Sequence, residues 1–208
     1  MKTNGNTYTV IYTTLVCVLV AAILAVVSQT LKPRQDANEK AETARQILVA
    51  AGYGEMEGWR KTGNNAVLNF FNDNIVGNPQ IYSTSQLKAQ NYNIRDGKPL
   101  SLPLYKFRNG ITVLAIYGAG LWGPVWGYIG LEEDMATVAG AYFDHESETP
   151  GLGGKIKDDP AFRASFKGKT VGEDGQIEFD AISGATMTSR GLDKAIKNWL
   201  GAYKNSEL

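Results

Sequence analysis

The chain has few of the residues that build metal centres and disulfides. Its 208 residues include one cysteine, Cys17, and one histidine, His145. A single cysteine excludes a disulfide within one chain, and a single histidine excludes zinc sites built from paired histidines or from cysteine and histidine. We therefore expect neither a metal site nor thiol chemistry.

An excess of charge of either sign is also lacking. The 21 Lys and Arg residues balance the 21 Asp and Glu residues. No positive surplus indicates DNA or RNA as a partner. The length predicts one domain, with room for an appendage.

The N-terminus contains a long run without charge. Residues 10–27 read VIYTTLVCVLVAAILAVV, and with their uncharged neighbours they are long enough to cross a bilayer as a helix. A cleaved signal peptide is the alternative, but the apolar run is longer than usual and no clean small-residue cleavage site follows it. We expect a retained membrane anchor over residues 1–31 and a domain over residues 32–208.

Proline punctuates the exit from this run. Lys32-Pro33-Arg34 is predicted to end the membrane helix, because proline interrupts helical hydrogen bonding. Asp36 or Asn38 would then cap a second helix that runs to about Ala51.

The rest of the chain changes from helical to strand-like periodicity, with Asn-Gly and Glu-Glu-Asp as hairpin turns. The predicted elements are a helix at 66–71, hairpins 104–108 with 111–117 and 126–131 with 137–144, a strand at 177–182 and a helix at 188–203. This order predicts an α+β fold with a largely antiparallel sheet and flanking helices.

A glycine pattern follows the first hairpin strand. Gly118–Gly123 fits the G-x-G-x-x-G spacing of dinucleotide-binding folds, but the next residues read as a strand where that fold needs a helix. We therefore expect no such site. Glycine-rich backbone beside Trp122 could still accommodate a flat ring, whereas we expect Trp126 and Tyr128 in the sheet core.

A second glycine-rich segment lies at residues 145–155, HESETPGLGGK. Its exposed N–H groups could bind an anion or a ring carbonyl. His145 with Glu146 and Glu148 could alternatively act in acid–base catalysis, or the segment could be a surface turn with solvated charges.

A third segment, residues 180–189 (DAISGATMTS), precedes the last helix. It could be a turn through Gly184 followed by a helix cap from Thr186, Thr188 or Ser189. Alternatively, the helix start could hold a phosphate beside the Thr186 hydroxyl.

A catalytic triad of Ser183, His145 and Asp180 is formally available, although no nucleophile-elbow pattern surrounds the serine.

Two glycine-rich loops with aromatics, next to a hydroxyl at a helix start, suit a flat ring that carries a phosphate. A flavin mononucleotide (FMN) has these two parts. An ester between Thr186 and the phosphate would leave one negative charge where the helix dipole favours it.

The chain resembles the C subunits of the sodium-translocating NADH:quinone reductase and, more distantly, the G subunits of the Rnf electron-transport complex. The resemblance rests on the N-terminal span, Leu31-Lys32-Pro33, Gln46-Ile47-Leu48, Gly120-Leu121-Trp122, the Glu148–Gly154 loop and the Ser-Gly-Ala-Thr run.

The resemblance implies that a flavin transferase links FMN through its phosphate to Thr186. Asp180, Ser183, Gly184 and Ala185 would complete the recognised motif. The residues that would lie near the flavin ring or ribityl chain are Leu121, Trp122, Thr149, Gly151 and Leu152.

The implied role is electron carriage in the bacterial inner membrane, without a catalytic acid or base and without an NADH site on this chain. Electrons would pass to a partner membrane protein with a second covalent FMN, and finally to ubiquinone. The family places the domain on the periplasmic side. The count of positive charges after the span points to the cytoplasm instead.

Three alternatives stand beside this interpretation. They are an Rnf G subunit with the same cofactor, a membrane-anchored binding or assembly module with an unmodified Thr186, and an envelope serine hydrolase that uses Ser183 and His145.

Overall fold

The computed structural model describes residues 5–83 and 101–204. The chain divides into two compact units at the bond between Glu42 and Thr43. The first unit is the greater part of one helix, and the second is a globular α+β unit.

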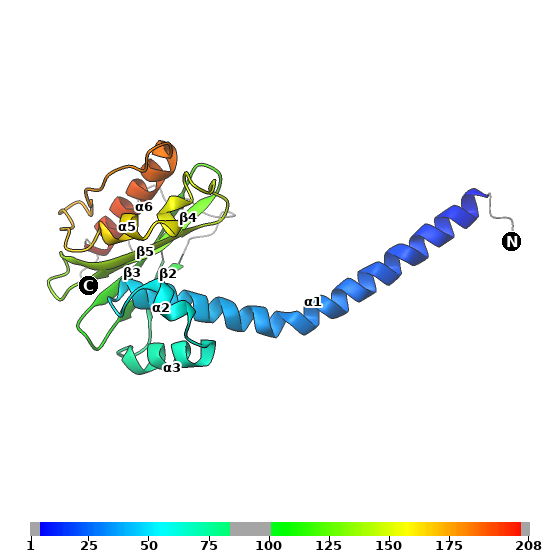
Figure 1. Cartoon of the computed structure of the whole chain (residues 1–208), viewed down its shortest axis with the longest axis horizontal. Coiled ribbons are helices and arrows are strands. Elements are labelled where there is room, and N and C mark those ends of the chain that lie inside the picture. Colours follow the sequence, from blue (N-terminus) through cyan, green and yellow to red (C-terminus); the bar gives the residue numbers. More distant parts are fainter. Residues whose placement is uncertain (1–4, 84–100, 205–208) are drawn as a thin grey trace. The chain divides into compact units, whose positions relative to one another are not determined.

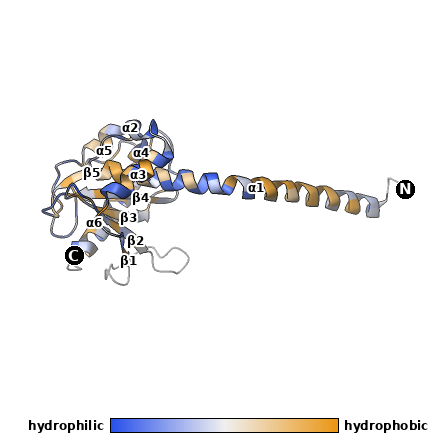
Figure 2. Cartoon of the chain, turned by 90° about the horizontal axis from the view of Figure 1, so that it is seen from below, coloured by the Kyte–Doolittle hydropathy of each residue, from blue (hydrophilic) through white to orange (hydrophobic). Residues whose placement is uncertain are grey.

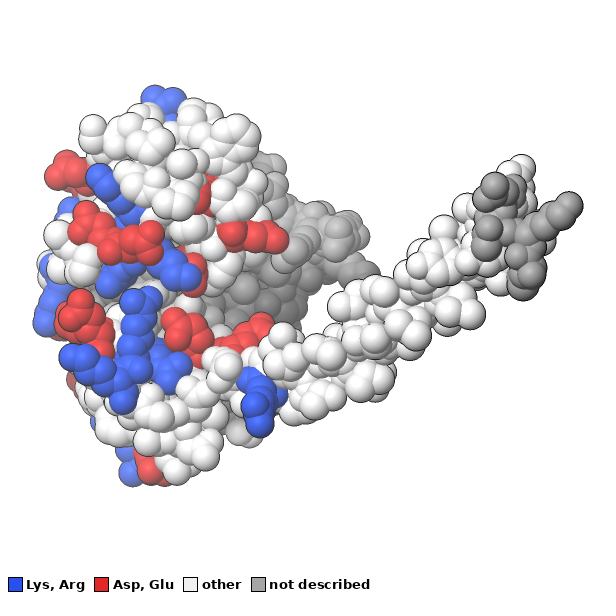
Figure 3. All heavy atoms as spheres, turned by 45° about the vertical axis from the view of Figure 1, so that its right-hand side comes forward, with Lys and Arg blue, Asp and Glu red and all other residues white. Residues whose placement is uncertain are grey.

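Helix α1 runs from Asn6 to Ala50. Among the described helices it alone is long and apolar enough to cross a membrane. Its N-terminal part is hydrophobic and the stretch that follows is hydrophilic (Figure 2). In a space-filling view, much of the apolar part carries no charged side chain (Figure 3).

The prediction that the helix ends at Lys32-Pro33-Arg34 was wrong, because Pro33 lies inside α1. Asp36 and Asn38 are likewise interior helical residues and not caps. Proline removes one backbone donor at a cost of about 3 kcal/mol. The following residues, QDANEKAETA, are rich in strong helix formers, so the helix continues beyond the proline.

The globular unit contains one antiparallel sheet with the strand order β1-β2-β3-β4-β5. Each strand pairs with its neighbour in the chain, which confirms the predicted α+β class. The strands are β1 Gln80–Ser83, β2 Ser101–Lys106, β3 Thr112–Ala119, β4 Pro124–Leu131 and β5 Val138–His145. The helices are α2 Met56–Arg60, α3 Asn64–Asn74, α4 Lys155–Asp158, α5 Pro160–Ala164 and α6 Thr186–Lys204.

Both predicted hairpins are present. Gly110 turns the β2–β3 hairpin with φ 84°, and the Asn109 side-chain amide donates to the Ala51 carbonyl at 2.9 Å. In the β4–β5 turn the Asp134 carboxylate accepts from the Thr137 backbone N–H at 2.8 Å. The first bond ties its turn to the end of α1, and the second is local to its turn.

The sheet is covered on both faces (Figure 1). Leu114 and Ile129 pack with helix α6 in one core cluster, and Val113 packs with Ile47 and Leu48 of α1 in another. Neighbouring residues of β3 thus face opposite layers, as the pleat of a strand requires. Helix α6 is also tied to β3 by the Trp199 indole, which donates to the Tyr117 carbonyl at 2.9 Å.

The strand predicted at 177–182 was wrong, because these residues form no strand. Ile177 and Ile182 are buried, and the Phe179 ring contacts Phe162 and Phe166. The apolar alternation therefore reflects side chains buried against the core without a backbone ladder.

Candidate functional site

Three separate segments meet at one buried carboxylate. Glu148 is 3% exposed. Its Oε1 accepts from the Trp122 backbone N–H at 2.8 Å, and its Oε2 accepts from the Thr188 hydroxyl at 2.5 Å. The loop after β3, the loop after β5 and the start of α6 are thereby joined, although they lie far apart in the sequence.

Glycines pack directly against this carboxylate. A Cβ at Gly120 would lie 2.4 Å from Oε1, and a Cβ at Gly153 would lie 2.4 Å from Oε2. Neither position has room for a side chain. The glycine pattern after β3 therefore serves close packing, and β4 begins at Pro124 without an intervening helix, which agrees with the expected absence of a dinucleotide fold.

The hydroxyls near the start of α6 differ in exposure. Thr188 and Ser189 are buried; the first donates to Glu148, and the second accepts from the Ile182 N–H at 3.0 Å. Ser183 and Thr186 are exposed.

Thr186 is the first residue of α6, two residues earlier than predicted. Within the described residues its hydroxyl has no hydrogen-bond partner. The contacts of Thr186 therefore do not support the prediction that it caps α6.

The turn before the helix uses left-handed backbone. Gly184 has φ 77°, and a Cβ there would lie 3.0 Å from the Leu152 side chain. Ala185 is buried, and its carbonyl accepts from the Ser189 N–H at 2.9 Å. Asp180 is exposed. The Leu152 loop therefore lies against the turn that leads to Thr186.

Exposed apolar side chains gather on these same segments. Seven large apolar side chains of the described globular unit are exposed, and four belong to the segments joined at Glu148. The four are Leu121 (50% exposed), Trp122 (67%), Leu152 (44%) and Met187 (55%). Thr149 and Gly151 are exposed in the same loop. An apolar cluster of this kind marks a binding surface.

A groove of about 670 Å³ is lined by Gly118–Gly120, Met187, Arg190 and Lys194, among others. Met187 is the residue that follows Thr186 in the chain. Its volume is within the range of cofactor sites.

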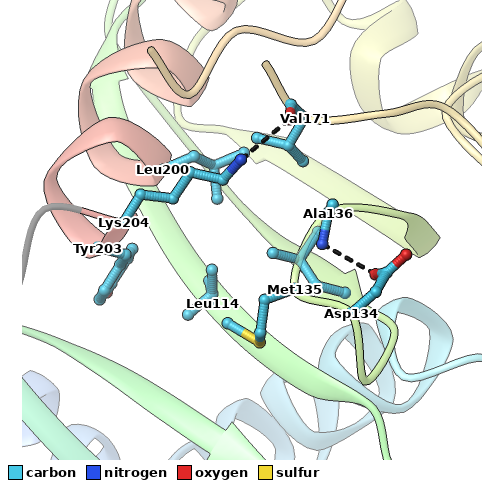
Figure 4. Close-up of a pocket in the computed structure, with 9 residues that line it drawn as sticks. Leu114, Asp134, Met135, Ala136, Val171, Leu200, Tyr203 and Lys204 are labelled. Carbon is cyan, nitrogen blue, oxygen red and sulfur yellow. Dashed lines mark hydrogen bonds between the residues drawn. The ribbon is translucent and has the colours of Figure 1, made fainter. Parts of the chain in front are cut away.

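A smaller cavity of about 250 Å³ lies near the other end of α6, beside Leu200 and Tyr203 (Figure 4). At about 1.5 Å per helical residue, it is about 25 Å from Thr186. Hydrogen bonds from Thr137 lower the pKa of Asp134 at its edge, so this carboxylate is already engaged. We do not assign the flavin to this cavity.

The described residues show no catalytic arrangement that would support the acid–base or the hydrolase alternative. The Nδ1 atom of His145 accepts from the Glu148 N–H at 3.2 Å. Within the described residues no hydrogen bond joins His145 to Ser183 or Asp180. Glu146 is exposed, whereas Glu148 is buried, so the surface-turn interpretation fits only the first of the two carboxylates.

Comparison with known proteins identifies the family. The C subunit of the Na(+)-translocating NADH-quinone reductase of Haemophilus ducreyi is 31% identical over 234 residues, covering 95% of this chain and 90% of that protein. The chain belongs to this family of C subunits. The C subunit of the same reductase from Pseudomonas aeruginosa is 28% identical and covers 95% of this chain and 92% of its own length.

Two further comparisons agree with this family. The crystal structure of the C subunit from Parabacteroides distasonis superposes with a TM-score of 0.64 at 26% identity, over 83% of this chain and 94% of that one. The family model of the FMN-binding domain matches residues 120–201. That range contains the Trp122 loop, the Glu148 loop and Thr186.

Sequence reasoning missed two residues of the site. Glu148 was placed in a loop of solvated or catalytic charges, and Thr188 among possible helix caps. The sequence shows glycines at positions 120 and 153, but their contact with the Glu148 carboxylate exists only in the folded chain, so no sequence signal identified this residue.

Proposed function

We propose that this chain is the electron-carrying C subunit of a sodium-translocating NADH:quinone reductase, with FMN joined through its phosphate to Thr186. One observation carries the proposal. Thr186 presents an exposed hydroxyl without a partner among the described residues, at the first position of α6, inside the matched FMN-binding region and beside exposed apolar side chains.

The start of α6 suits a phosphate. The first N–H groups of a helix have no partner within the helix, and the helix dipole favours negative charge there. In the attachment step, Thr186 Oγ would form a bond to the flavin phosphorus while the bond from phosphorus to the donor's leaving group breaks. The hydroxyl proton would pass to a base of the flavin transferase. Asp180, Ser183, Gly184 and Ala185 would form the segment that this enzyme recognises.

The surrounding side chains would hold the ring. Leu121, Trp122 and Leu152 are apolar and exposed, and Thr149 and Gly151 offer backbone groups in the same loop. FMN, when bound, supplies reversible electron uptake. The chain contributes binding and orientation, and no residue here need act as an acid or a base.

The same proposal places the chain in the bacterial inner membrane. Residues 10–27 of α1 would span the bilayer, and the globular unit would lie on the periplasmic side. From there electrons would pass to a membrane protein of the complex that holds a second covalent FMN, and then to quinone.

The test is flavin fluorescence on a denaturing gel, after coexpression with a flavin transferase. We expect a fluorescent band for the wild-type chain and for Ser183→Ala, because that exposed hydroxyl is not the proposed acceptor. We expect no band for Thr186→Ala. A dark wild-type chain beside an active transferase would contradict the proposal, and fluorescence that survives Thr186→Ala would place the attachment elsewhere.

A further inference from the structure

We propose that Glu148 is the positioning residue of the flavin site: its buried carboxylate holds the Trp122 loop against the first turn of α6 and sets the charge beside the ring. This inference rests on the proposed FMN attachment to Thr186. It concerns a residue that neither the attachment motif nor the ring-facing set contains.

The carboxylate is the only described side chain that bonds both parts of the site. Oε1 accepts from the Trp122 N–H, and Oε2 accepts from the Thr188 hydroxyl. Trp122 would face the ring, and Thr188 lies two residues after the attachment point. A second bond supports the loop, because the Ser147 hydroxyl donates to the Trp122 carbonyl at 3.0 Å. Glu148 therefore sets the distance between Trp122, which would contact the flavin ring, and Thr186, to which the FMN would be attached.

The protein is built closely around this group. Gly120 and Gly153 each approach one carboxylate oxygen too closely for a Cβ, and the Glu148 backbone N–H is held by His145 Nδ1. These close contacts restrict the movement of the Glu148 side chain, which is what a positioning residue needs.

The charge of Glu148 is buried without a counterion. Among the described residues no lysine or arginine forms an ion pair with it, in contrast to buried Asp144, which pairs with Lys157 at 2.8 Å. A buried charge without a cation is costly. A negative charge held in a poorly polarisable site also disfavours the addition of electrons to a nearby group. Glu148 would therefore lower the reduction potential of the flavin.

Position and charge can be separated with two substitutions in the full chain, coexpressed with a flavin transferase. Glu148→Gln keeps the shape and can still accept from Trp122, while its amide donates to Thr188. We expect a positive shift of the flavin midpoint potential with unchanged flavin fluorescence anisotropy. Glu148→Ala removes both bonds, and we expect a positive shift together with a loss of anisotropy, because the tethered ring gains freedom.

Two variants serve as controls. Glu146→Gln removes an exposed charge two residues away and should change neither readout. Thr188→Val keeps the Glu148 charge but removes one bond, so it should lower the anisotropy without the positive shift of Glu148→Gln. Circular dichroism of each variant checks that it is folded.

The outcomes distinguish the two proposals. If the wild-type chain carries flavin and Glu148→Gln has the wild-type potential, the role assigned to the charge is overturned. Unchanged anisotropy in a folded Glu148→Ala overturns the positioning role. A wild-type chain without flavin overturns the proposed function itself, and the assignment of Glu148 with it.

Discussion

Burial separates side chains that look equivalent in the sequence. Thr186 and Thr188 are neighbours of similar chemistry, yet Thr188 is buried and donates to Glu148, while Thr186 is exposed. The sequence pattern alone left both available as helix caps. The folded chain leaves Thr186 accessible to a modifying enzyme, and this difference supports its assignment as the acceptor.

The left-handed backbone conformation of Gly184 gives a testable prediction. Gly184→Ala forces a side chain into left-handed backbone at φ 77° and places its Cβ 3.0 Å from Leu152. We expect a loss of about 1–2 kcal/mol in the free energy of unfolding, together with reduced flavin attachment. Urea unfolding and flavin fluorescence measure the two effects.

Gly168→Ala is the matched control for this prediction. Gly168 has φ 76°, and nothing lies within 4 Å of a Cβ added there, so its substitution should cost similar stability and leave flavin attachment unchanged. Equal flavin attachment in both variants would show that contact between Leu152 and the turn does not matter.

Among the helices and strands, those determined by local sequence were predicted correctly, whereas those determined by tertiary contacts were not. The Asn109-Gly110 turn, both hairpins and α6 follow from turn chemistry and periodicity. The segment 177–182 alternates like a strand but has no neighbouring strand to pair with. The continuation of the helix across Pro33 was missed. The proline removes one hydrogen bond, but the helix-forming residues on both sides of it are enough to keep the helix continuous.

The packing of α6 on β3 gives a prediction for these elements. A Cβ at Gly191 would lie 2.2 Å from the Ala119 carbonyl oxygen. Gly191→Ala should therefore force α6 away from β3 and lower the free energy of unfolding by about 1–3 kcal/mol. Urea unfolding measures this loss.

Gly58→Ala in α2 provides a contrast, because nothing lies within 4 Å of the added Cβ. Alanine should stabilise this helix by up to about 1 kcal/mol. A Gly191→Ala protein as stable as the wild type would contradict the close packing of helix and strand.

At the scale of the whole molecule, the sequence indicated an apolar N-terminal helix and an antiparallel α+β unit, and the structure contains both. It could not indicate how the site is assembled. The bonds of Glu148 connect residues 26 and 40 positions away, and such long-range contacts leave no periodic pattern in one sequence.

The orientation of the chain in the membrane can be tested with its single cysteine. Cys17 lies within the apolar run, so a Cys17→Ser chain with Glu173→Cys carries one exposed thiol on the globular unit. We expect a membrane-impermeant maleimide to label it in cells with a permeabilised outer membrane and an intact inner membrane. Labelling only after lysis would place the unit in the cytoplasm.

The most direct test of FMN attachment to Thr186 is mass spectrometry of the tryptic peptide that covers residues 170–190. It contains Thr170, Ser183, Thr186, Thr188 and Ser189 between the cleavage sites after Lys169 and Arg190. For protein coexpressed with a flavin transferase, we predict a mass increase of one FMN less one water, with fragment ions that assign it to Thr186. An unmodified peptide from that preparation, or a flavin on any other of these hydroxyls, would overturn the proposed attachment to Thr186.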